Sequence, residues 1–227
     1  MLFTRERIKP LLEKYLGALP ANGQEVAAKD LGIHPPEGQV AKAVYKGSEP
    51  RATVQLIWSG GFNFSQQENV VLDALKECLE IRLLERLRED ESGVYAPSAF
   101  ASSVKFPQQR YTLGVFFGCG PQNVEKLITS TLDEIAKLKV SGPPQVNVDK
   151  WRAESLRQRE IALKTNNWWQ VYLNDQNING EDLSAFQQYE SQVTAVTPEM
   201  VKEMAQKYLS GKNYIRLVLL PEKVSSQ

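Results

Sequence analysis

The sequence predicts an α+β fold in which an antiparallel-rich sheet carries its helices on one face. Short segments with the alternation and β-branched residues of strands gather in the first half of the chain, whereas the second half holds long segments with apolar residues at helical spacing. One more apolar stretch, Tyr214–Leu220 (YIRLVLL), follows the last helix and is expected to return as a buried strand. Strands grouped early, helices grouped late and a returning strand are typical of an α+β domain.

The composition is that of an ordinary globular chain. Its 227 residues can bury a full core, and 42% of them are hydrophobic and 24% charged. Lys+Arg and Asp+Glu are each 27, so the formal net charge is +0 and nothing electrostatic favours nucleic acid or an anionic membrane. No apolar run approaches the roughly 20 residues that span a bilayer. Residues 1–10 carry charges where a signal peptide would be apolar.

Residues 1–35 are expected to be a remnant helix and linker from a preceding domain, and residues 36–227 to form the C-terminal α+β domain. Thr4 can cap a helix with one apolar face, in which Pro10 weakens the first turn or moves the start later. Residues 17–38, rich in proline and glycine, are interpreted as the linker. Little sequence precedes the helix, so we interpret the chain as a piece of a longer protein.

Two strands and a long helix open the domain. The alternating segment 40–46 and the β-branched segment 53–58 are the expected strands, and Ser59-Gly60-Gly61 ends the second. Ser65 and Glu68 form a capping box at the start of a helix over 66–89. Its core face is supplied at helical spacing by Val70, Val71, Ala74, Leu75, Cys78, Leu79, Leu83 and Leu87.

The remaining elements follow from turn and capping residues. Segments 95–104 and 110–118 are expected to pair as an antiparallel hairpin across a turn at 106–109. Pro121 suits the start of the next helix, and the break at 141–144 (SGPP) follows it. Thr197 and Pro198 mark the start of the last helix. Further helices are expected over 148–165, around 168–173 and over 184–192.

The chain lacks the residue sets on which hydrolases depend. It holds one histidine, His34, in a proline-rich segment, whereas a catalytic zinc needs three protein ligands that usually include His or Cys. Cys78 and Cys119 lie in apolar surroundings without metal-ligand spacing, so both are interpreted as buried thiols. No G-x-S-x-G, P-loop or G-x-G-x-x-G motif occurs. We therefore expect no catalytic residue, metal ligand or cofactor in this chain, and no activity from it alone.

Arg88 and Tyr95 are the candidate substrate-binding residues. They flank an acidic turn closed by Gly93 in LLERLREDESGVY (83–95), where the long helix passes to the following strand. A structural role is open for both, since arginine in a last helical turn complements the helix dipole and tyrosine is common in strands. The functional alternative is that a guanidinium and a phenol hold the carbonyls of an extended peptide, which positions its scissile bond for catalysis by another domain.

Trp168 and Trp169 indicate a third and weaker possibility, an independent small-molecule site. Adjacent positions on a helix point about 100° apart. One of the two rings is therefore expected in the core and the other partly exposed.

Four segments, in this order, resemble the C-terminal half of the pitrilysin-like (insulinase, inverted-zincin) zinc metallopeptidases. LLEKYLGALP (11–20) resembles the helix after a preceding domain, and 40–64 resembles the opening strands with their lysine-glycine turn. Arg88 and Tyr95, seven positions apart, match the family's substrate-gripping pair in type and spacing. Residues 166–222, from NNWWQVYL to the final LPE, resemble the tail. The resemblance covers most of the chain.

This resemblance implies a metallopeptidase-half domain of the pitrilysin/processing-peptidase type, in a clamshell of two halves. Zinc would be held by H-x-x-E-H in an N-terminal half that this chain lacks, on the same polypeptide or on a homologous subunit. That half and a peptide substrate would be the chain's partners, and family analogy suggests the periplasm as the compartment. The family also includes inactive partner subunits, so a non-enzymatic scaffold subunit of the same fold is the alternative.

Overall fold

The chain divides into two compact units, Met1–Leu31 and Gly32–Gln227. The computed structural model describes residues 4–20, 27–90, 94 and 96–222, with side chains left out at 88–90. The first unit contains helix α1 (Arg5–Tyr15), whose apolar residues Leu11, Leu12 and Tyr15 are about half exposed or more. Thr4 stands at its N-cap without a side-chain hydrogen bond, and the helix continues through Pro10. Of the two expectations for Pro10, a later helix start is therefore wrong. The other, a weakened first turn, stays a prediction, since the proline removes one backbone donor inside the helix.

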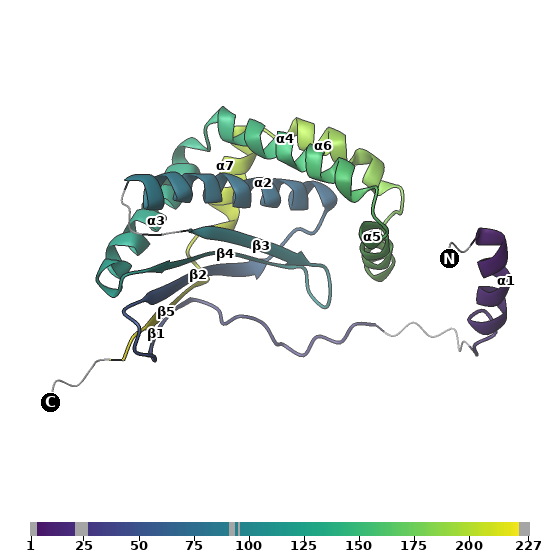
Figure 1. Cartoon of the computed structure of the whole chain (residues 1–227), viewed down its shortest axis with the longest axis horizontal. Helices are drawn as coiled ribbons and strands as arrows, with labels where there is room; N and C mark the ends of the chain where they lie inside the picture. The colour runs from purple at the N-terminus through teal and green to yellow at the C-terminus, as the bar shows by residue number, and fades with distance from the viewer. Residues whose placement is uncertain (1–3, 21–26, 91–93, 95, 223–227) are drawn as a thin grey trace. The chain divides into compact units, whose positions relative to one another are not determined.

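A five-stranded sheet forms the floor of the second unit, with the strand order β1-β5-β2-β4-β3 (Figure 1). Within the described residues β1 pairs parallel to β5, and the other three pairings are antiparallel. The last strand of the chain, β5, therefore lies between β1 and β2, and this part of the sheet depends on pairing between residues far apart in the sequence. The strands are β1 (Gln39–Tyr45), β2 (Ala52–Gly61), β3 (Ser98–Val104), β4 (Arg110–Cys119) and β5 (Tyr214–Leu220).

Helices α2, α3, α4, α6 and α7 lie on one side of the sheet, in two layers, and α5 lies beside the ends of β3 and β4 (Figure 1). Helix α2 rests on the sheet together with α3 and α7, and α4 and α6 lie over α2 on the side away from the strands. The antiparallel-rich α+β fold with helices on one face is therefore confirmed. The helices are α2 (Gln66–Leu83), α3 (Val124–Ser141), α4 (Gln145–Ala162), α5 (Asn166–Asn179), α6 (Tyr189–Ala195) and α7 (Pro198–Tyr208).

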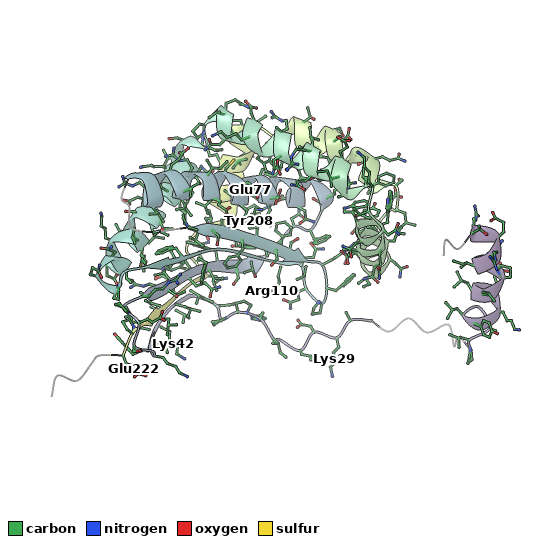
Figure 2. The ribbon with its side chains drawn as sticks, viewed as in Figure 1. Lys29, Lys42, Glu77, Arg110, Tyr208 and Glu222 are labelled. Atoms are coloured by element: carbon green, nitrogen blue, oxygen red, sulfur yellow. The ribbon has the colours of Figure 1, made fainter. Side chains whose placement is uncertain are left out.

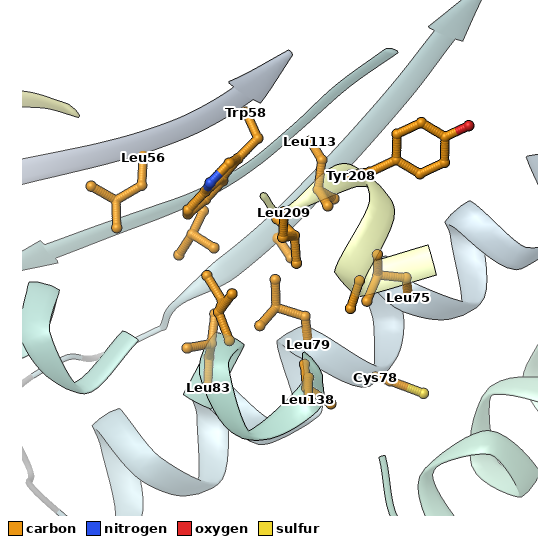
Figure 3. Close-up of a cluster of buried hydrophobic side chains, with 14 of the residues drawn as sticks. Leu56, Trp58, Leu75, Cys78, Leu79, Leu83, Leu113, Leu138, Tyr208 and Leu209 are labelled. Atoms are coloured by element: carbon orange, nitrogen blue, oxygen red, sulfur yellow. The ribbon is translucent and has the colours of Figure 1, made fainter. Parts of the chain in front are cut away.

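The hydrophobic core fills the space between α2 and the sheet. Leu56 and Leu113 from the strands meet Leu75, Leu79 and Leu83 from α2, and all five are 0% exposed (Figure 3). Burying a leucine side chain stabilises the fold by about 1.5–3 kcal/mol. Tyr208 lies on this covered side, whereas Lys42 and Arg110 lie on the opposite, helix-free side of the sheet (Figure 2).

Capping residues fix where the helices begin. The hydroxyl of Ser65 accepts a hydrogen bond from the Glu68 amide at 3.1 Å, as the capping box predicts. Thr197 caps α7 in the same way through the Met200 amide at 3.3 Å. Thr165, expected inside a helix, instead caps α5 by accepting from the Trp168 amide. Helix α4 consequently runs three residues earlier than the predicted 148–165, starting directly after Pro144 at its N-cap.

Three strand predictions need correction. Gly60 and Gly61 continue β2 instead of ending it, because they pair with Tyr111 and Arg110 of β4. Strand β3 starts at Ser98 and not at 95, since Pro97 has no amide hydrogen for the ladder. The last strand, β5, pairs with a strand on each side but is only partly buried. Its Leu219 is 43% exposed, on the face of the sheet that no helix covers.

Gly114→Ala should destabilise the fold strongly for so small a change. A Cβ at this buried position would stand 2.3 Å from Cζ of Phe100 and 2.7 Å from the backbone oxygen of Leu56. We expect a loss of about 1–3 kcal/mol in unfolding free energy, measured by urea denaturation. Gly61→Ala is the matched control on the paired strand, because nothing lies within 4 Å of its Cβ position. Equal midpoints for the two variants would contradict the packing described here.

Candidate functional site

The candidate site lies where α2 ends. The helix was expected to run as a single α-helix to residue 89, but it changes at Leu84 into a π-helical segment, Leu84–Asp90. Arg88 belongs to this segment, and its side chain lies outside the described residues. Tyr95 is outside them altogether. The π-helix is rare and often marks functional positions, so its occurrence at Arg88 is informative.

Two buried anchors stand next to the predicted pair in the sequence. Leu87, which precedes Arg88, is 0% exposed and belongs to the hydrophobic core together with Leu83. Val94, which precedes Tyr95, is 6% exposed and forms an isolated antiparallel bridge with Cys119 at the end of β4. Leu87 and Val94, which flank residues 88–93, are therefore both packed against the body of the domain.

A buried ion pair holds α2 just before the π-helical segment. Arg82 donates to Oε2 of Glu134 on α3 through Nε at 3.1 Å and Nη2 at 2.7 Å. Lys137 donates to Oε1 of the same carboxylate at 2.6 Å. The Glu134 side chain is only 1% exposed, whereas Arg82 is 28% and Lys137 59% exposed. Burial alone would raise the pKa of Glu134, but the hydrogen bonds and charges of Lys137 and Arg82 outweigh it and lower that pKa.

A second bond joins α2 to the sheet nearby. Oε2 of Glu80 accepts from the backbone amide of Ala99 in β3 at 2.7 Å. Glu80 and Arg82 thus tie the last turns of α2 to β3 and to α3 respectively. Neither contact was predicted from the sequence, because both join residues at least nineteen positions apart.

The described part of the chain offers no place for a metal. No group of three His, Cys, Asp or Glu side chains comes together there. His34 is exposed, and its Nδ1 lies 2.9 Å from the carbonyl oxygen of Pro35. The zinc implied by the family resemblance does not fit the residues present, so no chemical step in this chain is assigned to a metal.

Both cysteines are buried, unbonded thiols, as predicted. Burial, followed by the charges of Glu77 and Asp73, raises the pKa of Cys78 to about 12. Burial also raises the pKa of Cys119. Since the thiolate is the reactive form, neither residue is suited to nucleophilic catalysis.

The tryptophan pair differs from its prediction. Neither Trp168 nor Trp169 is buried in the core; both are half-buried and stack edge to face at 4.8 Å. The reason is that α5 has no buried residue and contacts its surroundings chiefly through aromatic side chains. Trp169 packs on Phe186 at 5.3 Å, and Tyr172 stacks on Trp168 at 4.9 Å.

No helix in the described ranges is long and apolar enough to cross a bilayer.

Comparison with known proteins gives a family and a fold. The family model described as "Peptidase M16 inactive domain" matches residues 3–154, more than half of the chain. A protein of Haemophilus influenzae named "Probable zinc protease PqqL" is 28% identical over 135 residues, which cover 58% of this chain and 14% of that protein. The chain therefore spans about one seventh of the length of this curated relative.

Two solved structures share the fold over nearly the whole chain. The periplasmic protease PqqL from Escherichia coli superposes with a TM-score of 0.82 at 21% identity, covering 97% of this chain and 24% of that one. A peptidase M16 inactive domain from Pseudomonas fluorescens superposes with a TM-score of 0.78 at 15% identity, covering 99% of this chain and 53% of that one.

Glu134→Gln should destabilise the domain in a pH-dependent way. Because the pKa of Glu134 is lowered on folding, its stabilising effect is complete above the unfolded value of about 4.3 and is lost as the pH falls through the folded value. At pH 7 we expect a loss of about 1–3 kcal/mol, below the figure for a fully buried pair because both cations are partly exposed. Urea unfolding at pH 7 and pH 3.5 measures it.

The difference between Glu134→Gln and the parent chain should shrink at pH 3.5. Glu160→Gln is the control, since Glu160 is exposed and pairs only with Lys164 one turn away on the surface. Its midpoint should equal that of the parent chain at pH 7. A Glu134→Gln variant as stable as the parent at pH 7 would show that the pair does not hold α2 to α3.

Proposed function

The chain belongs to the family of peptidase M16 inactive domains, and from this premise we propose that it is the substrate-binding C-terminal domain of a zinc metalloendopeptidase. It closes a peptide chamber against a zinc-bearing N-terminal half outside this chain. The single observation that carries the proposal is the family match, which includes the whole stretch from the linker through Arg88 and Tyr95. The resemblance to pitrilysin-like zinc metallopeptidases is confirmed by the same match and by the structural likeness to PqqL.

In the proposed role, the chain contributes binding groups and no reacting group. The Arg88 guanidinium and the Tyr95 hydroxyl donate hydrogen bonds to carbonyl oxygens of an extended peptide. Holding the peptide in this way places its scissile bond at the zinc of the other half. Such positioning removes translational and rotational freedom before the reaction and lowers the barrier without any chemistry on this chain.

The position of Arg88 supports this role. It follows the fully buried Leu87 within a π-helical segment, behind an ion pair that fixes α2 to α3. A binding group attached to such a fixed backbone loses little entropy when it meets its ligand. An arginine with only a dipole-complementing role would need none of these supports.

The partner in this proposal is the N-terminal catalytic half, either on the same polypeptide or on a homologous subunit. The chain covers 24% of the E. coli PqqL chain, which leaves ample length there for a second half. That protein is described as periplasmic, and we propose the same compartment for this one. Residues 1–35 would then connect the domain to the one before it.

Arg88→Ala and Tyr95→Phe, made in the full-length protein, should each lower kcat/KM for peptide hydrolysis by about 10- to 1000-fold. Thermal unfolding should remain cooperative with little change in Tm, because in the proposed role the guanidinium and the hydroxyl contact the peptide and not the core of the domain. Arg7→Ala is the control: its side chain is exposed in the first unit and belongs to neither candidate site, so hydrolysis should be unchanged.

Two results would contradict the substrate-binding role. If both variants hydrolyse peptides at the parent rate, the domain acts as a scaffold of the same fold. If either variant loses cooperative unfolding, the residue has a structural role in the domain.

The isolated chain should bind no stoichiometric zinc. A structural or catalytic zinc site needs three or four protein ligands converging at about 2.0–2.3 Å, and the described residues supply no such group. Metal analysis after dialysis against zinc should give well below one equivalent. One equivalent retained at a defined site would show that the chain holds a zinc site of its own.

A further inference from the structure

A hollow of about 530 Å³ lies in the helix layer, away from Arg88. It opens between α2 and α4 and is closed at one end by Trp168 of α5 and Tyr189 of α6. We call it the α4–α5 pocket. A smaller hollow of about 260 Å³ adjoins it, since the two share Asp73 and Tyr189 as lining residues.

The acidic side chains of the α4–α5 pocket are already engaged. Asp73 accepts from Nε1 of Trp151 at 2.9 Å and pairs with Lys76 at 3.3 Å. Glu77, labelled in Figure 2, pairs with the same lysine at 2.5 Å. Glu154 accepts from Arg157 at 2.7 Å and from Gln158 at 2.7 Å. The pocket therefore has three carboxylates, each of which has a cationic or N–H partner.

The two cationic side chains of the pocket, Arg159 and Lys150, differ from the carboxylates in having no ion-pair partner among the described residues. Within the described residues, neither Arg159 nor Lys150 has a carboxylate within the 4.0 Å of an ion pair, although both line the pocket. Nη2 of Arg159 donates to the carbonyl oxygen of Phe186 at 3.1 Å. Its Nε and Nη1 have no acceptor in the described part of the chain. Burial lowers the pKa of Arg159, against weaker opposing effects of Tyr189, Tyr172 and Glu190.

Two aromatic rings lie close to the Arg159 guanidinium. Its Cζ lies 4.1 Å from the ring centre of Trp168 and 4.8 Å from that of Tyr189. Cation–π contacts of this kind restrain the guanidinium and leave its unpaired N–H groups able to meet a ligand. A planar guanidinium edge matches a planar carboxylate through two parallel hydrogen bonds. The walls beside it are apolar at Ile81 and Ala162.

We propose that the α4–α5 pocket binds the carboxylate of a peptide, with Arg159 as the anion receptor and Trp168 and Ile81 as the wall for an apolar side chain. Lys150 at the rim adds a second positive charge. The adjoining hollow, lined by the amides Gln66, Asn69 and Gln176, receives the rest of the peptide backbone. The identification of the ligand as a peptide rests on the proposed function. The identification of a carboxylate as the group that binds rests on the residues of the pocket.

The test measures binding to the full 227-residue chain and involves no hydrolysis. A negative result would therefore not count against the proposed role of Arg88 and Tyr95. Likewise, a negative result for Arg88 and Tyr95 in hydrolysis would not count against carboxylate binding in the α4–α5 pocket. The probe is acetyl-Ala-Leu-Leu as the free acid, followed by isothermal calorimetry and tryptophan fluorescence. We expect saturable binding that weakens at least about tenfold for the C-terminal amide and for Arg159→Lys, which keeps the charge but loses the fork.

Further arms identify the source of the carboxylate. Acetyl-Ala-Glu-Leu amide carries its only carboxylate on a side chain, and its binding would extend the site to acidic residues within a peptide. Lys150→Ala should weaken binding only a few-fold, since its charge is exposed. Arg7→Lys, an exposed change in the other unit, is the control and should have no effect.

Three results would overturn the proposal: no binding of any carboxylate peptide, equal binding of acid and amide, or undiminished binding by a folded Arg159→Lys variant. Binding of inorganic phosphate without the peptides would likewise assign the pocket to a different anion.

Discussion

The burial of helix α2 between the sheet and the outer helices is the interaction on which the rest of the domain depends. Val70, Leu75 and Leu79 are among its eight buried residues, and it meets β3, α3, α4, α6 and α7. At about 1.5–3 kcal/mol for each large side chain, this one helix supplies a substantial part of the burial energy of the domain. Its position in turn sets where α3, α4, α6 and α7 can lie.

Both candidate sites follow from that central position. One end of α2 is fixed by Glu80 and Arg82 and continues into the π-helical segment with Arg88. Three half-buried residues along the side of α2, Asp73, Glu77 and Ile81, form a wall of the α4–α5 pocket. The same helix therefore carries the predicted substrate contact at its end and lines the proposed carboxylate pocket along its side. Peptide binding at two places on one helix would let a long substrate be held at both.

Much of the fold could be predicted because its signals are local. Ser65 with Glu68, Thr197 with Pro198 and the alternation in β2 each depend on neighbours within a few residues. The errors occur where the bounds or the pairing of an element depend on a residue far away in the sequence or on one missing backbone N–H donor. Pro97 delays β3, Thr165 caps α5 instead of lying in α4, and the parallel pairing of β1 with β5 joins residues about 175 positions apart. Sequence periodicity carries no information on such pairings.

The site was predictable only in part, for the same reason. The segment with Arg88 was found from its position at the end of an amphipathic helix and from a family resemblance. The Glu134 carboxylate that secures it, and the cation–π contacts of Arg159 with rings from α5 and α6, arise only when distant segments meet.

Hydrolysis of a peptide by mixed halves tests the central claim most directly. The chain, a separately produced zinc-bearing half and their mixture would each be assayed with zinc. We predict activity in the mixture only, with the isolated chain and the isolated zinc-bearing half close to background. A stable complex that stays inactive, although the other half has a competent zinc site, would contradict the account and leave this domain as a structural partner.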